Sequence, residues 1–168
     1  TMMSSFSYRK YNWIVFASLS LADFIVWLAY MVISFILFKD TMVSGNGVAY
    51  ILNSFIFAIC SLSIGFLIGT ITHNKQAIGG IVNVVALGTS FLCGCFVPAS
   101  FMPDYVLKMA HILPTYYFVQ NNEIIKTLEY FKLETLQPLM INGTVILGFT
   151  LGFIILTLLI SKRKQSIG

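Results

Sequence analysis

The sequence predicts an all-α polytopic membrane protein, with four transmembrane helices and a pair of shorter helices between the last two. Hydrophobic residues make up 58% of its 168 residues, only 10% are charged, and the mean hydropathy is +0.88. In soluble domains about a quarter of the residues are charged, so this composition excludes a soluble domain. The apolar residues gather in four long runs, and about 20 such residues cross the hydrocarbon core of a bilayer. A single transmembrane domain, residues 1–168, follows.

The chain begins with a cytoplasmic or interfacial segment, residues 1–12, in which Ser, Phe and Tyr alternate before Arg9 and Lys10. Aromatic rings at headgroup depth beside basic residues are common membrane anchors. A cytoplasmic helix that touches a partner protein is the alternative interpretation.

The four predicted spans are residues 13–38, 48–71, 77–97 and 139–160. Asp23 is the only acidic residue inside these runs. A charged side chain at the centre of a bilayer costs about 3 kcal/mol on insertion scales, so Asp23 calls for an explanation. One interpretation places it about one turn inside the membrane in a structural role, and we favour it. The other makes Asp23 part of a polar path for a substrate.

Small residues recur at four-residue spacing in three of the spans, which gives each helix a smooth face. Such faces let membrane helices approach closely, although they occur in membrane proteins of every function. The residues predicted to pack helices are Ser61, Gly65 and Gly69 in the second span, Ala86 and Ser90 in the third, and Gly148 and Gly152 in the fourth.

An outer segment, residues 98–138, separates the last two spans, and three prolines are spread over its first half. Pro98, Pro103 and Pro114 cannot lie within one straight helix, because proline fixes φ and lacks a backbone donor. Pro103 followed by Asp104 favours the start of a short helix, which Pro114 ends. Residues 115–136 then form a second amphipathic stretch. We expect two short helices that dip into the outer leaflet.

The charge distribution predicts the orientation. No acidic residue lies in the N-terminal segment, the connection 72–76 or the C-terminal tail, which hold Arg9, Lys10, Lys75, Lys162, Arg163 and Lys164. Cytoplasmic loops are rich in Lys and Arg, so both termini and residues 72–76 are predicted to be cytoplasmic. Residues 39–47 and 98–138 then face outward.

No catalytic, cofactor-binding or metal-binding residues can be assigned. The chain has no phosphate-binding loop, zinc-protease motif or Gly-x-Ser-x-Gly elbow, and nucleic acid is not an expected partner. His73 and His111 lie on opposite sides of the membrane in this topology and cannot share a site. Asn142 begins a glycosylation sequon, but it lies at the mouth of a span and is set aside. The cysteines, which are interpreted as small buried hydrophobes, are Cys60, Cys93 and Cys95.

Taken together, these features resemble the membrane subunit of ABC-2 type transporters, over roughly residues 13–160. In that family the penultimate span ends in Gly, then Pro and Met-Pro or Leu-Pro follow, then a re-entrant helix pair, then Pro before aromatic residues. The corresponding residues here are Gly94, Pro98, Met102-Pro103, Leu113-Pro114 and Tyr116-Tyr117-Phe118.

The resemblance implies a permease of an exporter, in which two copies or homologues bind two separate ATP-binding subunits. It implies that ATP is hydrolysed in the partner chain, and that Arg9 and Lys10 lie where that partner docks. Family members usually have six spans, so this chain would hold the last four, in a bacterial cell membrane. The re-entrant gate would be formed by Gly94, Pro98, Met102, Pro103 and Pro114.

Two alternatives remain open. A small four-helix membrane partner or immunity protein, without transport activity, needs no more than four spans. An intramembrane enzyme would use Asp23 with His111 or Asn83, but nothing in the sequence groups these residues. The apolar spans suit peptides, drugs and lipids equally, so they do not identify a substrate.

Overall fold

In a computed structural model of the chain, the described residues are 8–72, 74–98 and 101–167, and every element among them is a helix. Each of the four long helices has an apolar stretch that is long enough to cross a membrane. The long helices are α1 (Tyr8–Leu37), α3 (Gly45–Ile71), α4 (Lys75–Leu92) and α7 (Leu133–Ile167). The short ones are α2 (Lys39–Met42), α5 (Asp104–Ala110) and α6 (Pro114–Lys126). The prediction of an all-α multi-pass membrane protein is therefore confirmed.

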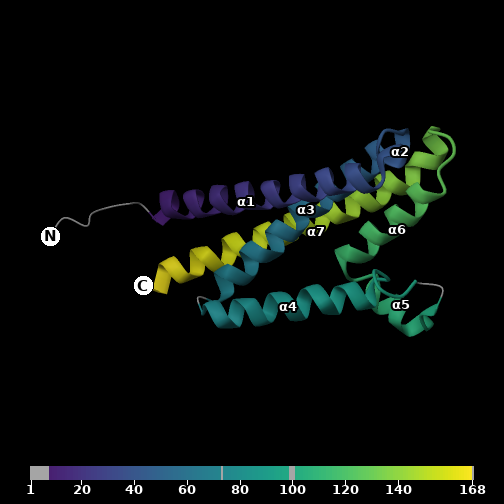
Figure 1. Ribbon diagram of the computed structural model, residues 1–168. Helices are drawn as coiled ribbons and strands as arrows, with labels where there is room; N and C mark the ends of the chain where they lie inside the picture. Colours follow the sequence, from purple (N-terminus) through teal and green to yellow (C-terminus); the bar gives the residue numbers. More distant parts are fainter. Residues whose placement is uncertain (1–7, 73, 99–100, 168) are drawn as a thin grey trace.

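The long helices form a bundle in which α3 is central, since it contacts α1, α4, α6 and α7. Figure 1 shows α1, α3 and α7 side by side, with α6 lying along one end of α3 and α7. Helix α4 diverges from this group, and the same view shows it joined to the rest at its two ends.

Helix α4 has a defined cap at each end. The Asn74 side-chain oxygen accepts hydrogen bonds from the backbone N–H groups of Gln76 at 3.0 Å and Ala77 at 3.4 Å, which satisfies donors of the first turn. At the other end Gly94 has φ 93°, and the Cys95 N–H donates to the Ser90 carbonyl at 3.1 Å. This is a Schellman ending, in which glycine adopts the left-handed conformation. The helix of the third predicted span therefore ends at Leu92, five residues before the predicted span bound at residue 97.

Helix α7 begins at Leu133, six residues before the predicted start of the last span at residue 139. The Thr135 hydroxyl accepts a hydrogen bond from the Lys132 N–H at 3.1 Å, which is the reaching-back half of a capping box. Pro138 lies inside the helix in its second turn, where it cannot donate a backbone hydrogen bond to the Glu134 carbonyl. The sequence interpretation placed residues 133–136 in an amphipathic stretch that α7 in fact contains.

The buried core lies mainly in α3, α6 and α7. Its most buried members include Cys60 of α3, Ile125 of α6 and Ile146 of α7, each with 0% exposure. By contrast, no residue in the apolar stretches of α1 and α4 is buried. The two helices therefore present most of their apolar surface outward, as lipid-facing helices do.

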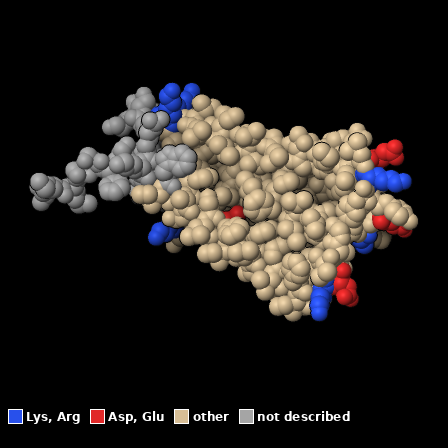
Figure 2. All heavy atoms as spheres, turned by 90° about the horizontal axis from the view of Figure 1, so that it is seen from above, with Lys and Arg blue, Asp and Glu red and all other residues tan. Residues whose placement is uncertain are grey.

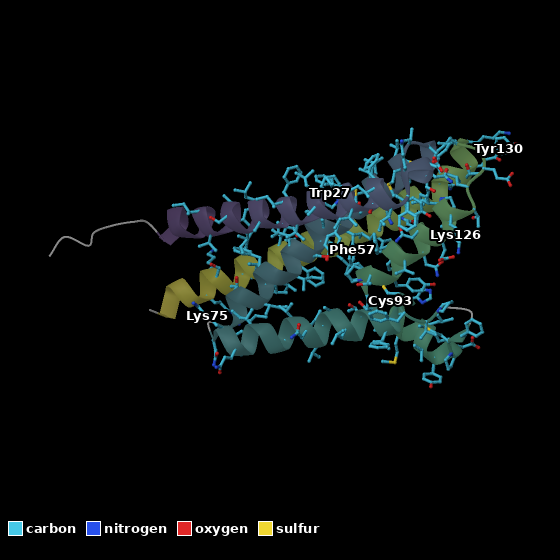
Figure 3. All side chains as sticks on the ribbon, in the orientation of Figure 1. Trp27, Phe57, Lys75, Cys93, Lys126 and Tyr130 are labelled. Carbon is cyan, nitrogen blue, oxygen red and sulfur yellow. The ribbon has the colours of Figure 1, made fainter. Side chains whose placement is uncertain are left out.

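Charged side chains gather at the two ends of the molecule, and the middle is apolar. Among the coloured atoms, Figure 2 shows blue without red at one end, blue and red together at the other, and one acidic group within the tan middle. In Figure 3, Lys75 lies at the α3–α4 turn, whereas Lys126 and Tyr130 lie at the opposite end. This distribution fits a body that crosses a membrane with both ends in water.

Candidate gate segment and the asparagine network

The five predicted gate residues lie at or near helix ends. Gly94 terminates α4, Pro103 is the N-cap of α5, and Pro114 is the first residue of α6. Pro98 is exposed and Met102 is half-buried between α4 and α5. Since Pro103 has φ −62° and Leu113 before Pro114 is extended, each proline starts a new helix, as its fixed φ favours. The structure thus has a helix pair between the last two long helices, and a re-entrant path for it stays a prediction.

Helix α5 has little of its surface buried. Ala110 is its one buried residue, with 0% exposure. Tyr105, Met109 and Ile112, the last just beyond the helix, are each more than half exposed. The α5 helix therefore rests on its neighbours through one narrow face.

The turn between α5 and α6 is held by aromatic residues. The Tyr117 hydroxyl donates to the His111 carbonyl oxygen at 3.0 Å, and the Tyr116 ring lies 4.1 Å from the His111 ring. Burial raises the pKa of the Tyr116 phenol, with Tyr117 and Cys93 adding to the shift. The phenol therefore stays protonated at neutral pH, and this cluster is a packing contact.

Helix α6 is joined to α3 and α7 by four asparagines, which we call the asparagine network: Asn53, Asn121, Asn122 and Asn142. The Asn142 side-chain amide of α7 donates to the Asn121 oxygen at 2.9 Å. The Asn121 amide donates to the Asn53 oxygen of α3 at 3.0 Å. The Asn53 amide donates to the Asn122 oxygen at 2.9 Å. The chain of hydrogen bonds runs from α7 to α6, then to α3, and back to α6.

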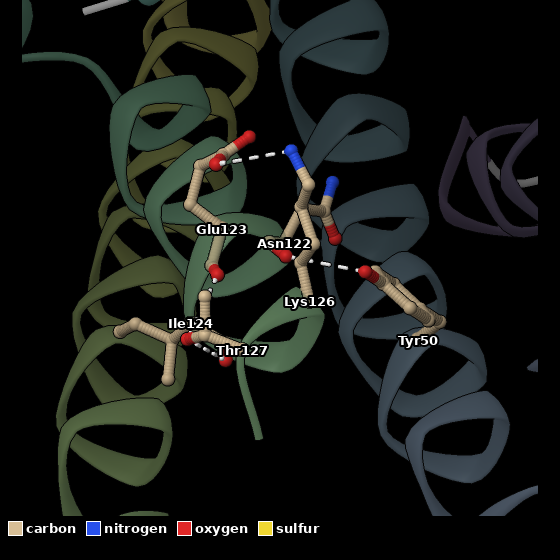
Figure 4. A network of polar contacts seen from close by, with 6 residues as sticks. All are labelled: Tyr50, Asn122, Glu123, Ile124, Lys126 and Thr127. Atoms are coloured by element: carbon tan, nitrogen blue, oxygen red, sulfur yellow. Dashed lines mark hydrogen bonds and ion pairs between the residues drawn. The ribbon is translucent and has the colours of Figure 1, made fainter. Parts of the chain in front are cut away.

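The network also reaches the backbone of α6 and α7. Asn53 donates to the Phe118 carbonyl at 3.1 Å, and Asn121 donates to the Leu139 carbonyl at 3.3 Å. The Tyr50 hydroxyl donates to the Asn122 carbonyl at 3.3 Å, a contact drawn in Figure 4.

At the end of α6, a side chain from α3 bonds one carbonyl of the last turn and one carbonyl just beyond the helix. The Asn46 amide donates to the Ile125 and Leu128 carbonyls, both at 3.0 Å. The last carbonyls of any helix lack intrahelical donors, so this contact acts as a cap supplied by another helix.

Burial makes the network costly to break. Asn53 is 5% exposed and Asn121 is 3% exposed, and every buried side-chain N or O atom in the described part of the chain has a partner. An interhelical hydrogen bond in a membrane protein contributes about 0.6 kcal/mol on average, and up to about 1.7. The three hydrogen bonds of the Asn121 side chain together are then worth about 2 kcal/mol.

Asp23 lies inside the apolar stretch of α1, and both interpretations of its role stay predictions. The apolar stretch of α1 begins by Ile14, nine residues earlier, so Asp23 lies about 13 Å farther along the helix axis. It shares a half-buried face with Ser20 and Trp27, and the Trp27 indole donates to Ser54 of α3 at 3.1 Å. Asp23 forms no hydrogen bond or ion pair within the described residues.

The predicted packing strips face away from the other described helices. A Cβ atom added at Gly65, Gly69, Gly148 or Gly152 would meet nothing within 4 Å there. Ser61 is exposed, and Ser90 takes part in the ending of α4. Gly143 lies closest to the α3–α7 contact, where an added Cβ would be 3.8 Å from Ile56. A packing role for the strips stays a prediction, and within this part of the chain no helix uses them.

Other predicted residues are less informative. The side chains of Arg9 and Lys10, and the whole of His73, lie outside the described residues. Asn83 lies in α4 and His111 in the α5–α6 turn, and no hydrogen bond joins either to Asp23 in the described part of the chain. No group of acidic, His or Cys side chains suited to a metal ion occurs among those residues.

A comparison with known families decides the identity. The family model for the ABC-2 type transporter matches residues 2–124. The chain belongs to the ABC-2 type transporter family. The match covers helices α1 to α5 and nearly all of α6, and therefore all five residues predicted to form the gate. Neither a curated protein nor a solved structure matches the chain.

As a member of the ABC-2 family, the protein is a permease component of an ABC transporter and a multi-pass membrane protein. Sequence reasoning did not group the four residues of the asparagine network, and the gate residues stay a prediction. A signal was present, because Asn53 interrupts an apolar run and Asn121 and Asn122 are adjacent. Polar side chains at membrane depth usually hydrogen-bond across helices, which was reason to group them.

Proposed function

We propose that this chain is the membrane subunit of an ABC exporter, which moves a substrate outward with energy from a separate ATPase subunit. The match to the ABC-2 type transporter family over residues 2–124 is the observation that carries the proposal. The partners are an ABC ATPase and a second permease copy or homologue, in a bacterial cell membrane. Residues 1–168 form one transmembrane domain.

The orientation is proposed from the charges at the two ends. The end that holds Lys75, Lys162 and Arg163 carries no acidic side chain, and we assign it to the cytoplasm. At the other end, Lys126 lies 3.9 Å from Glu123, so basic and acidic groups are mixed there. Both termini of this segment, together with Arg9 and Lys10, then lie on the side where a cytoplasmic ATPase can dock.

The mechanism needs two conformations whose balance the nucleotide state of the ATPase shifts. Helix α4 connects the cytoplasmic α3–α4 turn to the gate residues at the outer end, so it can transmit a movement between them. Asp23 gives a substrate a polar contact at mid-membrane depth. The small-residue strips, which no described helix covers, pack against the second permease.

The test is to purify the full-length permease with candidate ATPase partners and measure ATP hydrolysis and export in proteoliposomes. We expect a stable complex, with ATP hydrolysis stimulated by the permease and substrate export that requires ATP. A permease paired with an ATPase that cannot hydrolyse ATP is the control and should not export. A chain that inserts correctly but never recruits an ATPase would overturn the proposal and favour a non-transporting partner protein.

A further inference from the structure

Helix α6 is fixed to the bundle along its whole length. Near its start the Phe118 ring stacks on Phe57 of α3 at 4.4 Å. In its middle, Asn121 is bound from both sides, by α3 and by α7. At its end, Asn46 bonds the Ile125 carbonyl, and Ile125 is fully buried.

The asparagine network restricts how α6 can move. Its side-chain hydrogen bonds are 2.9–3.0 Å long, and such bonds weaken steeply beyond normal length and alignment. Because Asn121 bonds to both neighbours, α6 cannot slide along α3 without breaking its bond to Asn53, nor along α7 without breaking its bond to Asn142. The three helices are therefore expected to move as one body.

Helices α4 and α5 have a weaker attachment among the described residues, which includes the hydrogen bond from the Tyr117 hydroxyl of α6 to the His111 carbonyl at the end of α5. The apolar stretch of α4 has no buried residue, and an added Cβ at Gly79, Gly80 or Gly88 would meet no described neighbour within 4 Å. Helix α5 buries Ala110 alone. The backbone changes direction at Gly94, with φ 93°, and again at the extended Leu113 before Pro114. Two joints therefore flank α5, and α6 begins only after the second.

We propose that Asn53 and Asn121 are positioning residues that make α6 a fixed wall of the outer gate, while α4 and α5 are its moving part. This inference rests on the proposed transport function and divides the predicted gate in two. Gly94 and Leu113 are the joints on either side of α5, and α6 stays with α3 and α7 as the nucleotide state changes.

Distances between spin labels test the division directly in the full permease–ATPase complex. One labelled permease copy carries Glu123→Cys and Gln137→Cys, and the label pair reports the distance between exposed positions of α6 and α7. A second preparation carries Lys108→Cys and Gln137→Cys, which join α5 to α7. Both use a Cys95→Ser background, since Cys60 and Cys93 are buried.

Between the nucleotide-free and ATP-trapped complexes, we expect the α6–α7 distance to stay constant. The α5–α7 distance should shift by about 5 Å, the size of a one-turn displacement of one element past another. An α6–α7 shift as large as that of α5 would overturn the inference and leave the transport function standing. No shift in either pair, in a complex that hydrolyses ATP, would overturn both the inference and the proposed gate.

Substitutions test the role of the asparagines themselves. Asn121→Ala removes three side-chain hydrogen bonds and Asn142→Ala removes one, whereas Asn83→Ala is the matched control, since Asn83 is exposed on α4. The α6–α7 distance distribution should broaden most for Asn121→Ala, less for Asn142→Ala and least for Asn83→Ala. Export per ATP hydrolysed should fall about tenfold for Asn121→Ala, which corresponds to about 1.4 kcal/mol of lost coupling.

The ratio of export to hydrolysis separates positioning from simple stability, because it is measured only on inserted, assembled complexes. If Asn121→Ala does not assemble, Asn142→Ala and Tyr50→Phe, which each remove one hydrogen bond, take its place. Narrow α6–α7 distances and unchanged coupling in the assembled variants would overturn the role assigned to the asparagines.

Discussion

At the scale of single residues, Gly94 decides where α4 ends. Replacing it with alanine puts a Cβ atom on a residue with φ 93°, which costs about 1–2 kcal/mol. We expect Gly94→Ala to lower the unfolding free energy of the detergent-solubilised chain by that amount. Gly88→Ala is the control, because its added Cβ meets no described atom within 4 Å and alanine is the better helix former. Equal stability of the two variants would contradict the role of Gly94.

Asp23 is the residue whose depth in α1 calls most for a functional test. Asp23→Asn keeps the volume of the side chain and removes its charge, so insertion should improve by up to about 3 kcal/mol. Export should fall if the carboxylate contacts the substrate. Insertion efficiency and export in the same proteoliposomes check the two effects. Improved insertion with full export would remove Asp23 from the transport path.

At the scale of elements, the turn between α2 and α3 depends on two glycines with different surroundings. A Cβ at Gly47 would overlap the backbone of Met42, which cannot move aside without breaking the turn. A Cβ at Gly45 would instead press on the Phe131 ring, a side chain that can rotate. We expect Gly47→Ala to destabilise the chain by about 3 kcal/mol and Gly45→Ala by about 1 kcal/mol. Unfolding by denaturant in mixed micelles measures both, and a reversed order would contradict this account.

The short helices differ in how well their neighbours hold them. Helix α6 has Asn121 and Ile125 buried, whereas α5 buries only Ala110. Both were predicted as one amphipathic pair, because local periodicity reports which face of a helix is apolar. It does not report whether another helix lies against that face. The division of the pair into a fixed and a loosely held helix became visible only in the bundle.

At the scale of the whole molecule, the charges at its two ends make the orientation testable. Lys75→Cys and Lys108→Cys, each in the Cys95→Ser background, place one exposed thiol at either end. A maleimide that cannot cross membranes should label the Lys108→Cys protein in intact cells. It should label the Lys75→Cys protein only after the membrane is permeabilised, because Lys75 lies at the proposed cytoplasmic end. The opposite pattern would invert the topology.

The sequence by itself determined the four membrane-crossing helices and most of the points where the short helices start. Both depend on local chemistry: a span is a continuous apolar stretch, and a proline or glycine acts on the backbone where it stands. At Leu92 and Leu133 the helix ends differ from the predicted span bounds, because capping outweighs composition there.

Only the tertiary structure decided which polar side chains meet. Asn53 bonds to Asn121 although 68 residues separate them, and Asn142 proved to be a partner of Asn121. In an apolar bundle a buried amide must find a partner across helices, so the identity of that partner depends on how the helices are arranged in space. Polar residues within apolar runs indicate that these asparagines need hydrogen-bond partners. The fold determines those partners by placing α6 between α3 and α7.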